Sequence, residues 1–196
     1  MEAVIMGLGT RGGLYAEILS KRNIKIKAVA DFYEDKRKLA AEAYGVDKNL
    51  IFNNANDLLA MGKIADFAII ATLDADHYEQ AMKAIDLGYH LILEKPLCLT
   101  AQECRNVADA ATKKGVKVIV CHVLRYTPFY NKVKEIIDSG VIGKVVTISQ
   151  TENVGYWHQA HSYVRGNWAD TKKTSPLILA KSCHDLDIIR WLMDEP

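Results

Sequence analysis

Glycine residues near the amino terminus have the spacing of a phosphate-binding turn. Residues 7–12 read Gly-Leu-Gly-Thr-Arg-Gly, follow the short apolar run Ala3–Met6 and precede a segment with helical character. In this pattern the first glycine permits a tight turn, the second lets the backbone approach a pyrophosphate, and the third lets the helix pack closely. The amino terminus of the helix then offers N–H groups to an anion. The spacing predicts a dinucleotide site, and its expected binding residues are Gly7, Gly9, Thr10, Arg11 and Gly12.

A carboxylate follows the second apolar run of the chain. The run Ile24–Ala30 is followed directly by Asp31. A carboxylate at the end of this strand can accept hydrogen bonds from both ribose hydroxyls and would repel a 2′-phosphate. Asp31 therefore predicts NAD rather than NADP as the cofactor. Arg37, a few residues further on, is the residue that could reverse this preference.

A lysine follows the fifth predicted strand. Glu94-Lys95-Pro96 follows the run Tyr89–Leu93, and Ala71–Thr72 follows the preceding strand. Ligands bind at the carboxyl ends of strands in open α/β sheets, so these residues are expected to converge with the glycine turn. A lysine that is partly desolvated near a cation can exchange protons with a substrate. Taken alone, the tripeptide favours an ordinary turn after a strand.

A second cluster lies on the last predicted helix. Spacings of 4, 3, 4 and 3 residues place one set of side chains on a single helix face. That set is Leu177, Lys181, His184, Ile188 and Trp191. Asp187 lies one turn after His184 and could orient its imidazole, either in a buried site or in an ordinary core.

Two other arrangements are weaker. Cys183 and His184 are adjacent in the helix and point about 100° apart, which argues against a thiol nucleophile with its base. His158 and His161 have no nearby cysteine or carboxylate to complete a metal site. The sequence therefore predicts no metal centre.

Regular alternation of strands and helices positions the candidate residues. It predicts an α/β fold with a Rossmann-type doubly wound parallel sheet over residues 1–122, followed by the beginning of a mixed α/β substrate domain over 123–196. The expected strands are Ala3–Met6, Ile24–Ala30, Ile51–Phe52, Asp66–Ala71, Tyr89–Leu93, Val116–Val120 and Lys144–Gln150. The expected helices are Thr10–Ser20, Glu34–Tyr44, Asn56–Met61, Ala75–Leu87, a capping-box helix from Thr100 to about Lys114, Phe129–Ser139, and one that starts at Ser175-Pro176 and ends near Met193.

Composition excludes several classes of protein. The 196 residues have a formal net charge of +1, so no global field favours nucleic acid or acidic membranes. The four cysteines form no Cys-x-x-Cys pair and indicate free thiols. No apolar run approaches the roughly 20 residues of a membrane span, and the glycine turn begins too early for a signal peptide. We expect a cytoplasmic protein without a nucleic-acid or membrane partner.

The chain resembles the Gfo/Idh/MocA family of NAD(P)-dependent oxidoreductases over nearly its whole length. The similar motifs are GLGTRG, the AVAD that ends at Asp31, IAT separated by four residues from His77, LGYHLILEKPLCLTAQE from Leu87, LRYTPFY from Leu124, and SGVIGKV from Ser139. The resemblance implies interconversion of a secondary alcohol and a ketone on a sugar, polyol or related substrate. It also implies a substrate-binding second domain and a homo-oligomer.

The resemblance also assigns roles to individual residues. Lys95 would exchange a proton with the reacting hydroxyl, and Glu94 would lie beside the nicotinamide ribose. Arg125 and Tyr126 would lie near the nicotinamide or the substrate, and His184 matches a family histidine. The expected cofactor-binding set is completed by Ala71, Thr72, His77, Glu94, Lys95 and Arg125.

Three departures from the family pattern leave alternatives open. Ala180 stands where an aspartate is expected, Thr174-Ser175-Pro176 stands in place of a glycine-rich segment, and Lys181 is an additional cation near His184. We expect Lys95, His184 and Lys181 to form the catalytic group around a substrate hydroxyl. An NAD-dependent glycosidase of the same fold is one alternative. A truncated cofactor-binding protein without turnover is the other, because the chain is expected to end soon after its second domain begins.

Overall fold

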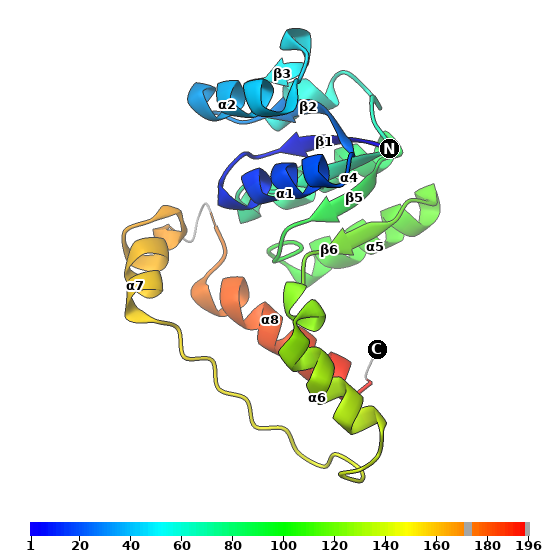
Figure 1. The fold of residues 1–196 in the computed structure, drawn as a ribbon, viewed down its shortest axis with the longest axis vertical. Helices are drawn as coiled ribbons and strands as arrows, with labels where there is room; N and C mark the ends of the chain where they lie inside the picture. Colours follow the sequence, from blue (N-terminus) through cyan, green and yellow to red (C-terminus); the bar gives the residue numbers. More distant parts are fainter. Residues whose placement is uncertain (171–173, 195–196) are drawn as a thin grey trace. The chain divides into compact units, whose positions relative to one another are not determined.

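The computed structural model describes residues 1–170 and 174–194 (Figure 1). Within it, the chain divides into two compact units, Met1–Val120 and Cys121–Pro196. The first unit contains a six-stranded sheet with the strand order β3-β2-β1-β4-β5-β6. Its strands are β1 (Glu2–Met6), β2 (Lys25–Ala30), β3 (Ile51–Phe52), β4 (Phe67–Ile70), β5 (His90–Leu93) and β6 (Val118–Val120).

All neighbouring strands of the sheet are parallel. Met6 at the end of β1 is level with Ala30 in β2 and with Ile70 in β4, and Ile70 is level with Leu93 in β5. The carboxyl ends of four strands therefore lie along one edge of the sheet. This confirms the predicted doubly wound parallel sheet, although several strands are one or two residues shorter than expected.

Helices cover both faces of the sheet. They are α1 (Thr10–Lys21), α2 (Glu34–Tyr44), α3 (Ala55–Leu59), α4 (His77–Asp86) and α5 (Ala101–Lys114). Ala3 and Ile5 of β1 pack in a core cluster with residues of α1 and α2. Val4 and Met6 point to the other face and pack with residues of α3, α4 and α5. The alternation along a single strand thus builds two cores, as expected for a strand buried on both faces.

Local signals set the ends of several helices. Thr100 and Glu103 form the predicted capping box at the start of α5, and Gly115 ends that helix in the left-handed conformation. Glu34–Tyr44 is helical as predicted. The helix expected from Ala75 begins instead as a 3₁₀ turn at Asp74–Asp76, and α4 starts at His77.

The second unit is built from α6 (Pro128–Asp138), α7 (Tyr156–His158) and α8 (Leu177–Leu192), with a 3₁₀ turn at Val123–Tyr126 and a π-helical turn at Gln159–Val164. The predicted amino-terminal cap of the last helix is wrong by one position. The cap is Pro176, whose carbonyl oxygen accepts hydrogen bonds from the N–H groups of Leu179 and Ala180.

The strand predicted at Lys144–Gln150 is not formed, and no strand occurs in the second unit among residues 121–170 and 174–194. The β-branched residues there have the right propensity. A strand also needs a neighbour that completes its hydrogen bonds, and the described part of this unit supplies none. Val146 accordingly is 87% exposed.

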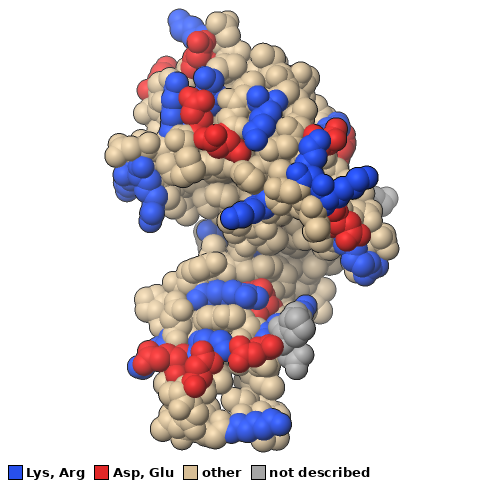
Figure 2. Space-filling view, turned by 90° about the vertical axis from the view of Figure 1, so that its right-hand side faces the viewer, with Lys and Arg blue, Asp and Glu red and all other residues tan. Residues whose placement is uncertain are grey.

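Charged side chains are mixed on the surface. Figure 2 shows that Lys and Arg side chains and Asp and Glu side chains are both spread over the face it displays, in keeping with the net charge of +1. In the part of the chain that the structure describes, no helix combines the length and the apolar character needed to cross a membrane.

Candidate active site

The glycine turn after β1 forms a cradle that larger residues could not build. Gly7 has a φ of +87°, and a Cβ there would lie 2.4 Å from the carbonyl oxygen of Ala71. A Cβ on Gly12 would lie 1.8 Å from the carbonyl oxygen of Gly7. A Cβ on Gly9, in contrast, would meet no atom within 4 Å. Gly7 and Gly12 are therefore required by the turn itself, whereas the space beside Gly9 is open, as the approach of a pyrophosphate requires.

Asp31 lies directly beside this turn. Its Oδ2 accepts a hydrogen bond of 2.6 Å from the N–H of Leu8, and its Oδ1 accepts one of 2.8 Å from the N–H of Tyr33. Arg37 donates to the carbonyl oxygens of Asp31 and Phe32, at 2.6 and 3.0 Å. The carboxylate at the end of β2 is thus fixed next to the glycine turn, and Arg37 is engaged with the backbone of the same loop.

The ends of β4 and β5 add polar groups to this edge. The Thr72 hydroxyl donates to Oε1 of Gln80 at 2.8 Å. Glu94 is 7% exposed, and its Oε1 accepts a 2.5 Å hydrogen bond from the hydroxyl of Tyr15. Nε of Arg11 lies 4.0 Å from the same oxygen. Sequence reasoning missed Tyr15, because its partner lies 79 residues away and nothing in the local pattern marks it.

Lys95 follows the buried Glu94 at this edge. The Lys95 side chain is half-buried, and its backbone N–H lies 3.2 Å from Oε2 of Glu94. The Lys95–Pro96 peptide bond is cis. Through the contact of its N–H with Glu94, Lys95 is linked to the same carboxylate that contacts Arg11 and Tyr15 of α1.

His77 is also tied to this loop, from the side of α4. It is fully buried, and its Nδ1 lies 2.8 Å from the carbonyl oxygen of Pro96. The sequence placed His77 among the cofactor-binding residues. The structure gives it a contact with the Lys95–Pro96 loop.

In the first unit, then, the structure brings together the residues that the sequence predicted for the cofactor. The glycine turn, Asp31, Ala71–Thr72 and Glu94–Lys95 share the carboxyl edge of the sheet, where open α/β sheets bind ligands. The open space at Gly9, the amino terminus of α1 and the fixed carboxylate of Asp31 fit a dinucleotide. They match its pyrophosphate and one of its riboses.

The second unit carries a separate polar cluster on α8. Lys181 and His184 are half-buried on the predicted face, on which Ile188 is fully buried. Nζ of Lys181 lies 3.1 Å from Oε1 of Glu152. The ring of His184 packs edge-to-face against His122, with centroids 5.7 Å apart. His122 was missed because its neighbours along the chain show no regular pattern.

Arg125 holds the carboxylate of Asp187 in this cluster. Nε and Nη2 of Arg125 donate to the two carboxylate oxygens, at 2.7 and 2.6 Å. The hydrogen bond to Asp187 raises the pKa of the Arg125 guanidinium. The sequence predicted that Asp187 could orient His184 and that Arg125 binds cofactor. Both stay predictions. The structure shows Asp187 paired with Arg125, in the two-point geometry that arginine forms best with a carboxylate.

Cys183 and His161, from the two weaker arrangements, have contacts with other groups. The Cys183 thiol donates to the carbonyl oxygen of Ala180 in its own helix, at 3.8 Å. The ring of His161 packs on Trp157, with centroids 3.8 Å apart. Burial raises the pKa of the Cys98 thiol to about 12, so this thiol is a poor nucleophile.

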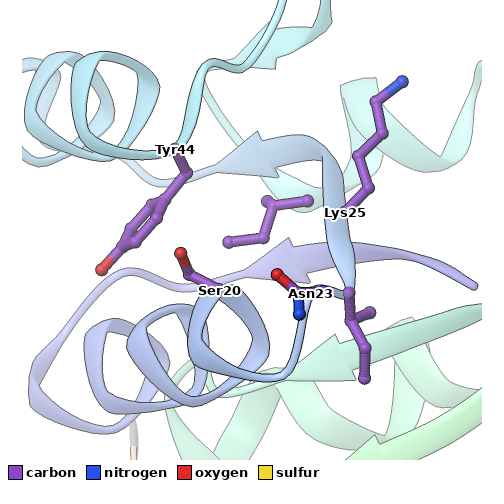
Figure 3. A pocket seen from close by; sticks show the side chains of 6 residues that line it. Ser20, Asn23, Lys25 and Tyr44 are labelled. Carbon is purple, nitrogen blue, oxygen red and sulfur yellow. The ribbon is translucent and has the colours of Figure 1, made fainter.

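A shallow pocket of about 280 Å³ lies elsewhere on the first unit. It is formed where α1 ends and β2 begins (Figure 3). Ser20, Asn23, Lys25 and Tyr44 supply its polar lining. Since β2 begins there, the pocket lies at the amino end of that strand. None of the candidate site residues lines it.

Comparisons with known proteins bear on both units. Residues 1–122 match the model of an oxidoreductase family with an NAD-binding Rossmann fold, and residues 134–196 match that family's C-terminal alpha/beta domain. The inositol 2-dehydrogenase of Salmonella typhimurium is 26% identical over 198 residues, which cover 100% of this chain and 55% of that protein. The inositol 2-dehydrogenase/D-chiro-inositol 3-dehydrogenase of Lactiplantibacillus plantarum is 28% identical over 97% of this chain and 52% of that protein.

A solved structure shows the same fold. Scyllo-inositol dehydrogenase from Lactobacillus casei, solved with NAD(H) and scyllo-inositol, superposes with a TM-score of 0.82 at 23% identity, over 99% of this chain and 56% of that one. The chain thus spans about half the length of these relatives. The predicted NAD cofactor is confirmed at the level of the family, whose Rossmann fold binds NAD. With both of its units matched by the family models, the chain belongs to the Gfo/Idh/MocA oxidoreductase family.

Proposed function

We propose that this chain acts in an NAD-dependent oxidoreductase that interconverts a secondary alcohol and a ketone on a sugar, polyol or related substrate. One observation carries the proposal. The glycine cradle, the Asp31 carboxylate and the Glu94–Lys95 pair meet at the carboxyl edge of one parallel sheet. This edge combines groups for holding a dinucleotide with a lysine that can exchange a proton.

In the proposed reaction, NAD when bound supplies the acceptor for a hydride. The N–H groups at the start of α1 and the open space at Gly9 hold the pyrophosphate. Asp31 accepts hydrogen bonds from ribose hydroxyls and disfavours a 2′-phosphate, which makes NAD the preferred cofactor. Glu94, fixed by Tyr15, holds the backbone of Lys95 in place.

Lys95 performs the acid–base step. Its neutral amine removes the proton from the substrate hydroxyl as the hydride leaves the carbon, and it returns the proton in the reverse direction. General base assistance of this kind contributes typically about 10²–10⁴ in rate. In the second unit, His184 is proposed to bind the substrate. Lys181 is proposed to contribute a positive charge that Glu152 partly neutralises.

The test is a screen of sugars, polyols and glycosides for NAD reduction or bond cleavage by the purified protein. We expect oxidation of a polyol or sugar by the unaltered chain and none by Lys95→Ala. Lys114→Ala, which removes an exposed lysine paired with Asp86 at 3.5 Å, is the matched control and should react normally. Unchanged rates in Lys95→Ala would contradict the role of Lys95.

The same screen separates the alternatives. Release of sugar without net NADH would indicate a glycosidase, the reaction that Ala180 and Lys181 leave open. Binding of NADH without any turnover would indicate a cofactor-binding protein. The homo-oligomer implied by the family resemblance stays a prediction.

A further inference from the structure

A buried histidine contacts the loop that carries Lys95. His77 is the first residue of α4, and its side chain is 0% exposed. A buried polar ring is costly unless it is hydrogen-bonded, and here Nδ1 lies 2.8 Å from the carbonyl oxygen of Pro96. A carbonyl oxygen can only accept, so Nδ1 must carry the ring proton. Within residues 1–170 and 174–194, the buried Nε2 has no hydrogen-bond partner. The hydrogen bond that the described structure gives this ring is therefore the one from Nδ1 to Pro96.

The loop after β5 is held at both of its ends. The N–H of Glu94 donates to the carbonyl oxygen of Ile70 at 2.9 Å, which continues the sheet. At the far end, the N–H groups of Leu99 and Thr100 lie 3.2 and 3.0 Å from Oε2 of Glu103 in the capping box. Pro96 lies between these anchors, next to Lys95. The contact with His77 therefore fixes the middle of the loop, where the lysine is carried.

A second residue on α4 has a similar relation to the neighbouring loop. Gln80 lies three residues after His77, on the same helix face, and its Oε1 accepts the hydrogen bond from Thr72 at 2.8 Å. One face of α4 thus contacts the loop after β4 through Gln80 and the loop after β5 through His77. This pattern indicates a brace for the carboxyl edge of the sheet.

We propose that His77 is a positioning residue for Lys95, acting through the carbonyl group of Pro96, and not a residue that contacts the cofactor. The inference rests on the proposed role of Lys95. A displacement of about 1 Å in a catalytic group can cost about 10²-fold in rate, so a loosened loop would lower kcat. Cofactor binding would change little, because the glycine turn and Asp31 are held by other contacts.

Two amide substitutions separate this role from simple packing. In His77→Asn the side-chain nitrogen occupies approximately the place of Nδ1 and can still donate to Pro96. In His77→Gln the nitrogen lies nearer the place of Nε2, and the contact is lost. Tyr78→Phe is the matched control, because it removes the 3.0 Å hydrogen bond from Asn106 at the adjacent position of α4 without touching the loop.

Three measurements are compared across the variants: hydrogen–deuterium exchange of the peptide 95–100, the Kd for NADH, and kcat and KM with the substrate found in the screen. For His77→Gln we expect exchange in this peptide to rise about tenfold and kcat to fall about 10–100-fold. KM and the Kd for NADH should stay within about threefold. His77→Asn should restore most of the protection and of kcat, and Tyr78→Phe should match the unaltered chain.

Equal exchange in His77→Gln and Tyr78→Phe would overturn the proposal, and so would failure of His77→Asn to restore either quantity. A loss of NADH binding in His77→Gln would also overturn it, because it would point to a direct role in holding the cofactor. If the unaltered chain turns over no substrate, the proposed function fails. The exchange comparison still decides whether His77 holds the loop.

Discussion

The two units differ in how much of their apolar surface they bury. In the first unit, every strand of the sheet has a parallel neighbour, and apolar residues on both faces are buried under helices. In the second unit, α6 has no buried residue, and the buried apolar residues of α8 are Ala180, Ile188 and Leu192. Side chains such as Val146 and Ile178 are 87% and 75% exposed. The first unit therefore completes its own core within residues 1–120, whereas the second offers apolar surface that its described residues do not cover.

This difference has a consequence for function. The residues proposed to hold the cofactor lie on the first unit, at the ends of strands that the core fixes. Sites on rigid elements keep their geometry better than sites on loosely packed ones. The candidate substrate residues His184 and Lys181 lie on a helix whose fixed position depends on fewer buried contacts and more on polar pairs.

The largest effect on stability is expected from a substitution in the core of the first unit. Ile70→Ala removes a fully buried side chain from β4 and should lower the free energy of unfolding by about 2–5 kcal/mol, because it leaves a cavity between the sheet and its helices. Urea unfolding followed by far-UV circular dichroism measures this. Ile178→Ala, on an exposed position of α8, is the control and should stay within about 0.5 kcal/mol. Similar losses in both variants would contradict the placement of Ile70 in the core of the first unit and of Ile178 on exposed surface of the second.

In the second unit, the ion pair of Arg125 with Asp187 is expected to contribute measurably to the free energy of unfolding. Asp187→Asn weakens the two-point contact with Arg125 and should cost about 1.5–3 kcal/mol of that unit's stability. Tryptophan fluorescence reports this unit selectively, because all three tryptophans of the chain lie in it. They are Trp157, Trp168 and Trp191. An unchanged fluorescence transition would show that the pair is dispensable. Asp185→Asn changes a carboxylate two residues earlier in α8, which accepts a hydrogen bond from Gln150. It tests whether another carboxylate of this helix has the same effect.

A smaller, purely functional effect is expected in the glycine turn. Gly9→Ala meets no protein atom and should fold normally, but its methyl group occupies the space proposed for the pyrophosphate. We expect the affinity for NADH to fall at least tenfold, about 1.4 kcal/mol, in an isothermal titration. Gly13→Ala, where a Cβ also meets no atom within 4 Å, should bind normally. Equal affinities in the two variants would place the pyrophosphate elsewhere.

Much of the first unit follows from local sequence. Short apolar runs punctuated by glycine mark its strands, and the capping box at Thr100 marks the start of α5. Because parallel strands end at one edge, their terminal residues could be predicted to converge there. The hydrogen bond between Tyr15 and Glu94 could not be predicted, since it joins elements that are far apart in the chain.

The second unit was harder to predict for the same physical reason. The segment 144–150 has the composition of a strand, yet a strand forms only against a partner, and propensity does not reveal whether one is present. Asp187 has two possible partners in the sequence, His184 one turn away on the same helix and Arg125 far away in the chain. The sequence drew attention only to the nearer one, whereas the structure shows a bidentate pair with the distant Arg125.

The central claim is that the first unit holds NAD at the carboxyl edge of its sheet, with Asp31 selecting against a 2′-phosphate. Titration of the purified chain with NADH and with NADPH tests it most directly. We expect NADH to bind at least about tenfold more tightly, a difference of about 1.4 kcal/mol, and Asp31→Ser to lose most of this preference. Absence of NADH binding, or NADPH binding as tight or tighter, would contradict the account.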